Sequence, residues 1–142
     1  MKLSAVTSAA IVVTGLLAST VVSADTLKKV AESGKITLAY RESSVPFSYL
    51  SGPGVPVGFA VDISNAVVDA VKKRVNNPAL KVELQAVTLQ NRIPLLTNGT
   101  IDLECGSTTN NSVRGKDVQF AVNYFYTGTR LLTKKTSGVK NY

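Results

Sequence analysis

Histidine is absent from this chain of 142 residues, and cysteine occurs only at position 105. A Ser–His–Asp triad or a Cys–His pair is therefore excluded within the chain, and zinc would lack most of its usual ligands. We expect no catalytic residue, no metal and no cofactor.

Acidic residues are also few, because 9 Asp and Glu stand against 16 Lys and Arg, which gives a net charge of +7. This excess is compatible with nucleic acid, an anionic membrane or an acidic small molecule as partner. An apolar fraction of 44% with 18% charged residues is typical of a globular protein and excludes a disordered one. The length suits one compact domain or a piece of a larger one.

Long apolar runs are confined to the N-terminus. Lys2 precedes the mostly apolar residues 5–22, and Val22-Ser23-Ala24 places small or β-branched residues where signal peptidase reads. We predict that residues 1–24 are a signal peptide cleaved after Ala24, and that residues 25–142 are exported. The alternative is an uncleaved membrane anchor, since the run approaches the length of about 20 residues that spans a bilayer.

The predicted export affects how the single cysteine is interpreted. In an oxidising compartment an unpaired thiol must be buried or it reacts. Leu103 and Gly106 flank Cys105 in a pattern typical of the end of a buried strand, so we expect an unreactive thiol. A reactive thiol and a disulfide to another chain are the alternatives.

Helix and strand patterns alternate through the first half of the mature chain. Asp25 caps a short helix that Gly34 ends, and residues 36–40 form an apolar strand. Residues 42–58 are rich in Gly and Pro and predict loops with a hairpin. A helix follows from Val61, ending at Lys72-Lys73-Arg74. Its predicted apolar face comprises Ile63, Ala66, Val67, Ala70, Val71 and Val75.

The second half continues the alternation. Residues 80–87 predict a strand, and Asn91 caps a short helix with Pro94 in its first turn and Gly99 beyond its end. Further strands are predicted at residues 100–105, 118–126 and 129–133, with a polar turn at 106–111. The alternation indicates an α/β fold, an open sheet flanked by helices, in which ligands sit beyond the carboxyl ends of the strands.

Three arginines stand at such ends: Arg41, Arg92 and Arg114. A guanidinium presents a planar fork of donors that matches a carboxylate, and Ser107 and Thr109 add hydroxyls in the polar turn. The arrangement favours a small ligand with more than one carboxylate. The alternative is that each arginine is solvated or paired with a nearby acid, namely Glu42, Asp102, Glu104 or Asp117.

Four segments resemble the periplasmic glutamate/aspartate-binding proteins of ABC importers. They are residues 41–49 (RESSVPFSY), 90–96 (QNRIPLL), 104–111 (ECGSTTNN) and 128–135 (GTRLLTKK). Residues 58–63 (GFAVDI) resemble the wider group of family 3 solute-binding proteins, although Ala60 replaces the usual acidic residue. The resemblance implies the first lobe of a type II periplasmic-binding-protein-like fold over residues 25–142, with the second lobe absent.

The resemblance also implies roles for the site residues. Arg114 with Thr109 would hold the α-carboxylate of L-glutamate or L-aspartate, and Ser107 would receive the α-amino group. Arg41 and Arg92 would hold the side-chain carboxylate. Leu89 departs from the family, whose members usually carry a Ser there that touches this carboxylate. The implied partners are the membrane permease subunits of the importer, in the periplasm.

Other functions remain open at this point. A single lobe leaves a bound dicarboxylate exposed to water, so weak binding is expected. One alternative is a non-functional truncated product that folds poorly. Enzymes of the cyclic carboxylate dehydratase type share the fold, but the chain has no histidine to act as acid or base. Nucleic acid is not expected as a partner, because the short basic runs lack an interleaved aromatic stripe.

Overall fold

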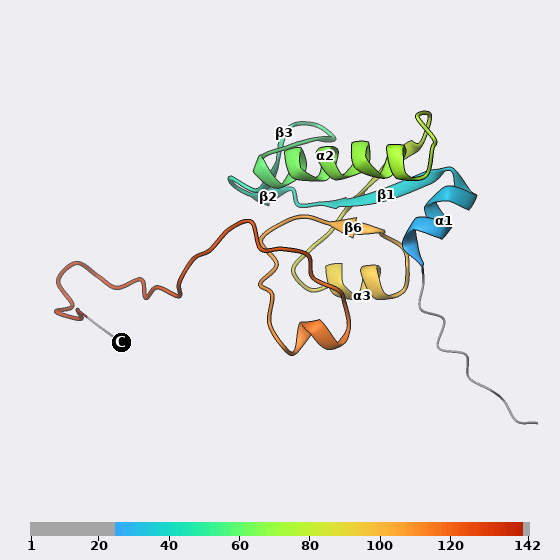
Figure 1. Ribbon diagram of the computed structural model, residues 1–142. Coiled ribbons are helices and arrows are strands. Elements are labelled where there is room, and N and C mark those ends of the chain that lie inside the picture. The colour runs from blue at the N-terminus through green and yellow to red at the C-terminus, as the bar shows by residue number, and fades with distance from the viewer. Residues whose placement is uncertain (1–24, 141–142) are drawn as a thin grey trace, which may run out of the picture.

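The computed structural model describes residues 25–140, and the predicted signal peptide lies outside the described residues. A parallel three-stranded sheet with the order β5-β1-β6 forms the centre (Figure 1). Its strands are β1 (Lys35–Tyr40), β5 (Lys81–Ala86) and β6 (Leu103–Glu104). The central position of β1 places its carboxyl end, at Arg41, in the middle of the sheet edge where ligands bind in such folds.

The first helix, α1 (Thr26–Ser33), has the predicted boundaries. The Asp25 carboxylate accepts a hydrogen bond from the backbone N–H of Lys28 at 3.2 Å. Gly34 ends the helix with φ 66°, a left-handed conformation that glycine adopts without steric cost. Capping chemistry in the sequence therefore fixed both ends of this element.

Helices cover the two faces of the sheet. The helix α2 (Phe59–Arg74) lies over one face and α3 (Arg92–Thr97) over the other (Figure 1). On the α2 side the buried residues are Val30, Ile36, Leu38, Val68 and Leu80. On the α3 side they are Ala39, Val87 and Ile101, with Leu95 and Leu96 packed against them. The predicted α/β architecture, with helices flanking an open sheet, is confirmed.

The buried face of α2 differs from the prediction. Ala60, Ser64 and Val68 are its buried residues, whereas Ala66 and Ala70, which were predicted to face the core, are exposed. Small apolar residues of α2 lie on all sides of the helix, so their periodicity alone does not predict which face is buried. Ser64 can lie at the centre because its hydroxyl donates to the carbonyl oxygen of Ala60 at 3.0 Å.

The helix α3 begins after Asn91 as predicted, but the capping is different. The side chain of Asn91 makes no capping bond to the helix, and its Oδ1 instead accepts from the backbone N–H of Thr88 at 2.7 Å. The amide thus closes the turn that precedes α3. Pro94 lies in the first turn and Gly99 follows the helix with φ 76°, both as predicted.

A second, antiparallel sheet contains the predicted hairpin. It consists of β2 (Ser43–Ser44), β3 (Ser48–Gly52) and β4 (Val55–Val57), in the order β2-β3-β4. Gly58 leads from this sheet into α2 with φ 123°, and a Cβ added there would lie 2.6 Å from the carbonyl oxygen of Phe47. Only glycine satisfies both constraints, and the junction fixes where α2 begins.

The predicted strand at residues 100–105 contracts to Leu103–Glu104, which pair with Leu38 and Ala39. Before this point the chain turns back to α3, where the N–H of Ile101 donates to the carbonyl oxygen of Leu95 at 3.1 Å. The carboxylate of Asp102 accepts the N–H of Thr37 at 2.8 Å. A side chain therefore takes one place in the ladder that a longer strand would have filled.

The strands predicted at residues 118–126 and 129–133 are not formed. Their β-branched and aromatic residues favour extended backbone, but a strand needs a neighbour that accepts its hydrogen bonds. Within residues 25–140 no such neighbour pairs with them, and Val122, Leu131 and Leu132 are exposed. A 3₁₀ turn, Arg114–Lys116, precedes this segment.

No helix in the described part of the chain has the length and apolarity to cross a membrane.

Candidate functional site

The carboxyl ends of the parallel strands bring charged side chains together. Arg41 follows β1, Glu104 is the last residue of β6, and Arg92 opens α3 after β5. The backbone of Arg41 is held by Ser48, whose buried hydroxyl accepts from the Arg41 N–H at 2.8 Å and donates to its carbonyl oxygen at 2.9 Å. The antiparallel sheet thereby fixes the start of the loop that presents Arg41.

Arg92 is the most deeply placed of the three predicted arginines, with 4% of its surface exposed. Burial lowers the pKa of its guanidinium, the carboxylate of Glu104 opposes this, and repulsion from Arg114 and Arg41 lowers it further. Arg41, Arg92 and Arg114 follow β1, β5 and β6 respectively, so all three come after the carboxyl ends of strands in one parallel sheet. Arg41, Arg92 and Arg114 are called the arginine cluster below.

Several donors in the cluster point at no acceptor. The buried atoms Nη1 of Arg41, and Nε and Nη1 of Arg92, have no hydrogen-bond partner among residues 25–140. Unpaired buried donors are costly, and buried polar groups in native proteins almost always have a partner. Such donors are suited to receive an anionic acceptor.

The polar turn after β6 supplies the remaining predicted residues. The guanidinium of Arg114 donates to the carbonyl oxygen of Thr109 at 3.0 Å. The hydroxyl of Ser107 lies 3.4 Å from that of Ser44 in β2. Arg114 and Thr109 are thus adjacent, although the contact uses the backbone of Thr109, and Ser107 sits between the turn and the antiparallel sheet.

Glu104 was expected only as one possible partner of an arginine, and the structure places it inside the site. Its Oε1 lies 3.7 Å from Nη1 of Arg92, and its Oε2 accepts the hydroxyl of Thr108 at 2.8 Å. A charged residue at the end of a buried strand was the available signal. That signal was ambiguous, because an acid at a strand end is more often solvated than buried.

Aromatic residues from the C-terminal segment pack against the turn. The Tyr124 hydroxyl donates to the carbonyl oxygen of Gly106 at 2.6 Å. The rings of Phe59 and Tyr124, and of Phe47 and Phe125, meet edge to face with centroids 5.6 and 4.9 Å apart. Burial raises the pKa of Tyr124 to about 12, helped by the charges of Cys105 and Glu104. The hydrogen bond attaches the segment to the turn that carries Ser107, and the ring contacts attach it to α2 and to the connection between β2 and β3.

Cys105 is half-buried beside this turn. Burial raises the pKa of its thiol, against a hydrogen bond from Ser64 that lowers it. A raised pKa favours the protonated thiol, which is the weaker nucleophile, and the unreactive cysteine stays a prediction.

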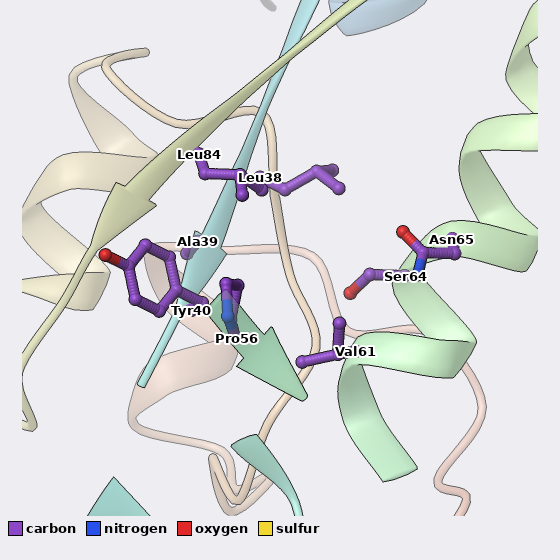
Figure 2. Close-up of a pocket in the computed structure, with 8 residues that line it drawn as sticks. All are labelled: Leu38, Ala39, Tyr40, Pro56, Val61, Ser64, Asn65 and Leu84. Atoms are coloured by element: carbon purple, nitrogen blue, oxygen red, sulfur yellow. The ribbon is translucent and has the colours of Figure 1, made fainter. Parts of the chain in front are cut away.

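An apolar cavity of about 190 Å³ lies elsewhere, between α2, β4 and the sheet (Figure 2). Leu38 and Leu84, which pair across β1 and β5, lie side by side in it, and Ser64 and Asn65 face them from α2. None of the arginines lines this cavity. The arginine cluster therefore lies outside this cavity.

Known proteins of similar sequence are solute-binding proteins. The L-glutamate/L-aspartate-binding protein of Pseudomonas aeruginosa is 53% identical over 135 residues, covering 92% of this chain and 45% of that protein. The glutamate/aspartate import solute-binding protein of Escherichia coli K12 is 55% identical over 117 residues, covering 82% and 39%. The chain thus spans less than half the length of both relatives.

A solved structure shows the same fold as a single domain. Domain 1 from TmArgBP of T. maritima, in an arginine-bound form, superimposes with a TM-score of 0.58 at 23% identity, covering 70% of this chain and 71% of that one. The predicted lobe of a type II periplasmic-binding-protein-like fold is confirmed. Residues 36–141 match the bacterial extracellular solute-binding proteins of family 3, and the chain belongs to this family.

Proposed function

We propose that this chain forms the lobe of a solute-binding protein that holds the carboxylates of L-glutamate or L-aspartate for an ABC importer. The observation that carries the proposal is the arginine cluster, with its unpartnered guanidinium donors at the carboxyl ends of parallel strands. A guanidinium binds a carboxylate through two parallel hydrogen bonds, so several of them select a ligand with two carboxylates.

Each site residue receives a role in this proposal. Arg114 and Thr109, which are in contact, hold the α-carboxylate, and Ser107 receives the α-amino group. Arg41 and Arg92 hold the side-chain carboxylate. The burial of Arg92 supports its assignment to the side-chain carboxylate. This carboxylate is the group that distinguishes these ligands from neutral amino acids.

The proposal includes the cellular setting. Residues 1–24 direct export and are removed after Ala24, residues 25–142 act in the periplasm as the first lobe, and the membrane permease subunits of the importer receive the ligand. The name of the Escherichia coli relative, an import solute-binding protein, supports the transport role.

Binding without turnover is the activity that we propose. The carboxylate nearest the cluster, Glu104, is engaged by Thr108 and faces Arg92. It is therefore poorly placed to act as a general base on a ligand. Nucleic acid is not a proposed partner, because Lys72 pairs with Asp69 at 3.8 Å and the rest of the basic run, Lys73 and Arg74, is the exposed end of α2.

Titration of the expressed chain with L-glutamate, L-aspartate and L-glutamine, followed by two-dimensional NMR, tests the proposal. L-Glutamine is the matched control, because an amide replaces one carboxylate. We expect the two acidic ligands to shift backbone signals of the turn at residues 106–111 and L-glutamine to have little effect. The R92Q variant should abolish the response and R74Q, at the exposed end of α2, should preserve it. Equal responses to all three ligands would contradict the proposal.

A further inference from the structure

Glu104 is an acidic side chain in a site otherwise built for anions. Its Oε1 lies 3.7 Å from Nη1 of Arg92, and the two side chains are 9% and 4% exposed. A charge-assisted hydrogen bond would be about 2.7–2.9 Å long, and neither atom has a partner among the described residues. The carboxylate therefore attracts Arg92 without occupying its donors.

The carboxylate of Glu104 is held in this place from behind. The Thr108 hydroxyl donates to Oε2 at 2.8 Å, and pairing of Glu104 with Ala39 fixes its backbone in the sheet. At Gly106 an added Cβ would overlap Oε1 of Glu104, so the backbone of Gly106 lies directly beside the carboxylate. Glu104 is consequently prevented from moving freely toward Arg92.

Arg92 depends on this carboxylate in the absence of a ligand. Its guanidinium is buried and is repelled by Arg114 and Arg41, and Glu104 is the attractive charge that opposes both effects. A buried charge that loses its partner destabilises a protein strongly. The carboxylate thus acts where a ligand carboxylate would act, but at a longer distance.

We infer that Glu104 is the internal counter-ion of the arginine cluster, a positioning residue that holds Arg92 in the empty site and competes with the ligand's carboxylate for it. The inference rests on the proposed function for the identity of that ligand. It predicts opposite effects of the Glu104 charge on the stability of the empty lobe and on the affinity for an anion. Removing the charge of Glu104 destabilises the empty lobe, and it strengthens the binding of an anion that then becomes the main counter-charge of Arg92.

The test compares wild type with E104Q, which removes the charge and keeps an acceptor for Thr108. The matched control is E83Q, because Glu83 pairs with Lys35 and Lys81 on the edge strand, away from the cluster. We expect E104Q to have a lower melting temperature without ligand and a dissociation constant for L-glutamate about fivefold lower than wild type, at the small end of couplings between sites. E83Q should leave the dissociation constant unchanged. A purely structural role would lower stability and weaken binding together, and that result would overturn the inference.

Two further arms keep the outcome decisive. If L-glutamate and L-aspartate bind to neither protein, the proposed function fails, and sulfate then serves as the probe. Stronger stabilisation by sulfate of E104Q than of E83Q supports the counter-ion role, and equal stabilisation overturns it.

If E104Q does not fold, the double variant R92Q/E104Q is measured. Recovery of folding when both charges are removed supports the inference, and failure to recover contradicts it.

Discussion

The ammonium of Lys29 lies 2.7 Å from Oδ1 of Asp102 and so joins α1 to the loop that enters β6. The same ammonium donates to the carbonyl oxygen of Gly99 at 2.7 Å, while Oδ2 of Asp102 accepts from the backbone N–H of Thr37. The Asp102 side chain is 3% exposed. One carboxylate thereby ties together a helix, the central strand and the loop after α3.

Replacing this carboxylate should destabilise the lobe. We expect D102A to lower the free energy of unfolding by about 3 kcal/mol, because it removes the counter-charge of Lys29 and leaves the Thr37 N–H without its acceptor. Urea denaturation measures the change. The control is D69A, whose carboxylate is 71% exposed and 3.8 Å from Lys72, and whose loss should cost less than about 1 kcal/mol. Equal effects of the two variants would show that the buried carboxylate has no special role.

Leu89 offers a gain-of-function prediction. It is 55% exposed, so a polar replacement removes nothing from the core, and the family pattern has a Ser at this position. We expect L89S to lower the dissociation constant for L-glutamate about tenfold by adding one hydroxyl donor to a charged acceptor. Titration beside L89A, which removes the same leucine without adding a donor, isolates the hydroxyl. An equal gain in L89A would contradict this reading.

Tyr124 should titrate late and give stability a defined pH dependence. Its pKa is raised from 10.0 to about 12, so the folded state favours the protonated phenol. The resulting stabilisation is fully present below pH 10 and is lost as the pH rises toward about 12. Absorbance at alkaline pH should show one late-titrating tyrosine that is missing in Y124F. Identical titration curves for wild type and Y124F would refute the placement of this hydroxyl.

Substitutions at Gly58 and Gly54 distinguish the cost of steric overlap from the cost of backbone strain. In G58A the new Cβ would meet the carbonyl oxygens of Phe47 and Pro46 in a backbone with φ 123°. We expect a loss of stability of about 2 kcal/mol or more. G54A is the matched control, because Gly54 has φ 70° but open space around a Cβ, and strain alone should cost about 1 kcal/mol. Thermal unfolding of the two variants measures the difference, and a smaller loss in G58A than in G54A would be inconsistent with the crowded junction.

Local chemistry explains why much of the fold could be predicted from the sequence. Asp25 and Gly34 carry the information for both ends of α1, and the run Lys35–Tyr40 forms β1 close to where it was expected. The alternation of patterns also predicted that Arg41 follows a strand of the sheet and that Arg92 opens a helix, and both are found. These predictions depend on short-range pattern or on general topology.

The remaining errors involve individual hydrogen bonds, ion pairs and strand pairings that the pattern of residue types does not reveal. The buried face of α2 is set by Ser64 satisfying its own hydroxyl within the helix, which apolar periodicity does not register. Residues 118–133 have strand-forming side chains but no pairing partner in the described chain. Glu104 acquires its place through Thr108 and Arg92, and neither contact follows from spacing. Where a residue's partner decides its state, the sequence pattern around that residue is insufficient.

The central position of β1 has a consequence for the order of folding. Both neighbours of this strand come later in the chain, since Lys35 pairs with Lys81 and Leu38 with Leu103. In a growing polypeptide the backbone of β1 therefore has no strand neighbour until β5 has been synthesised, and non-local pairing is slow to close. For a chain predicted to be exported, this delay is useful, because an unfolded polypeptide can be threaded through a narrow channel.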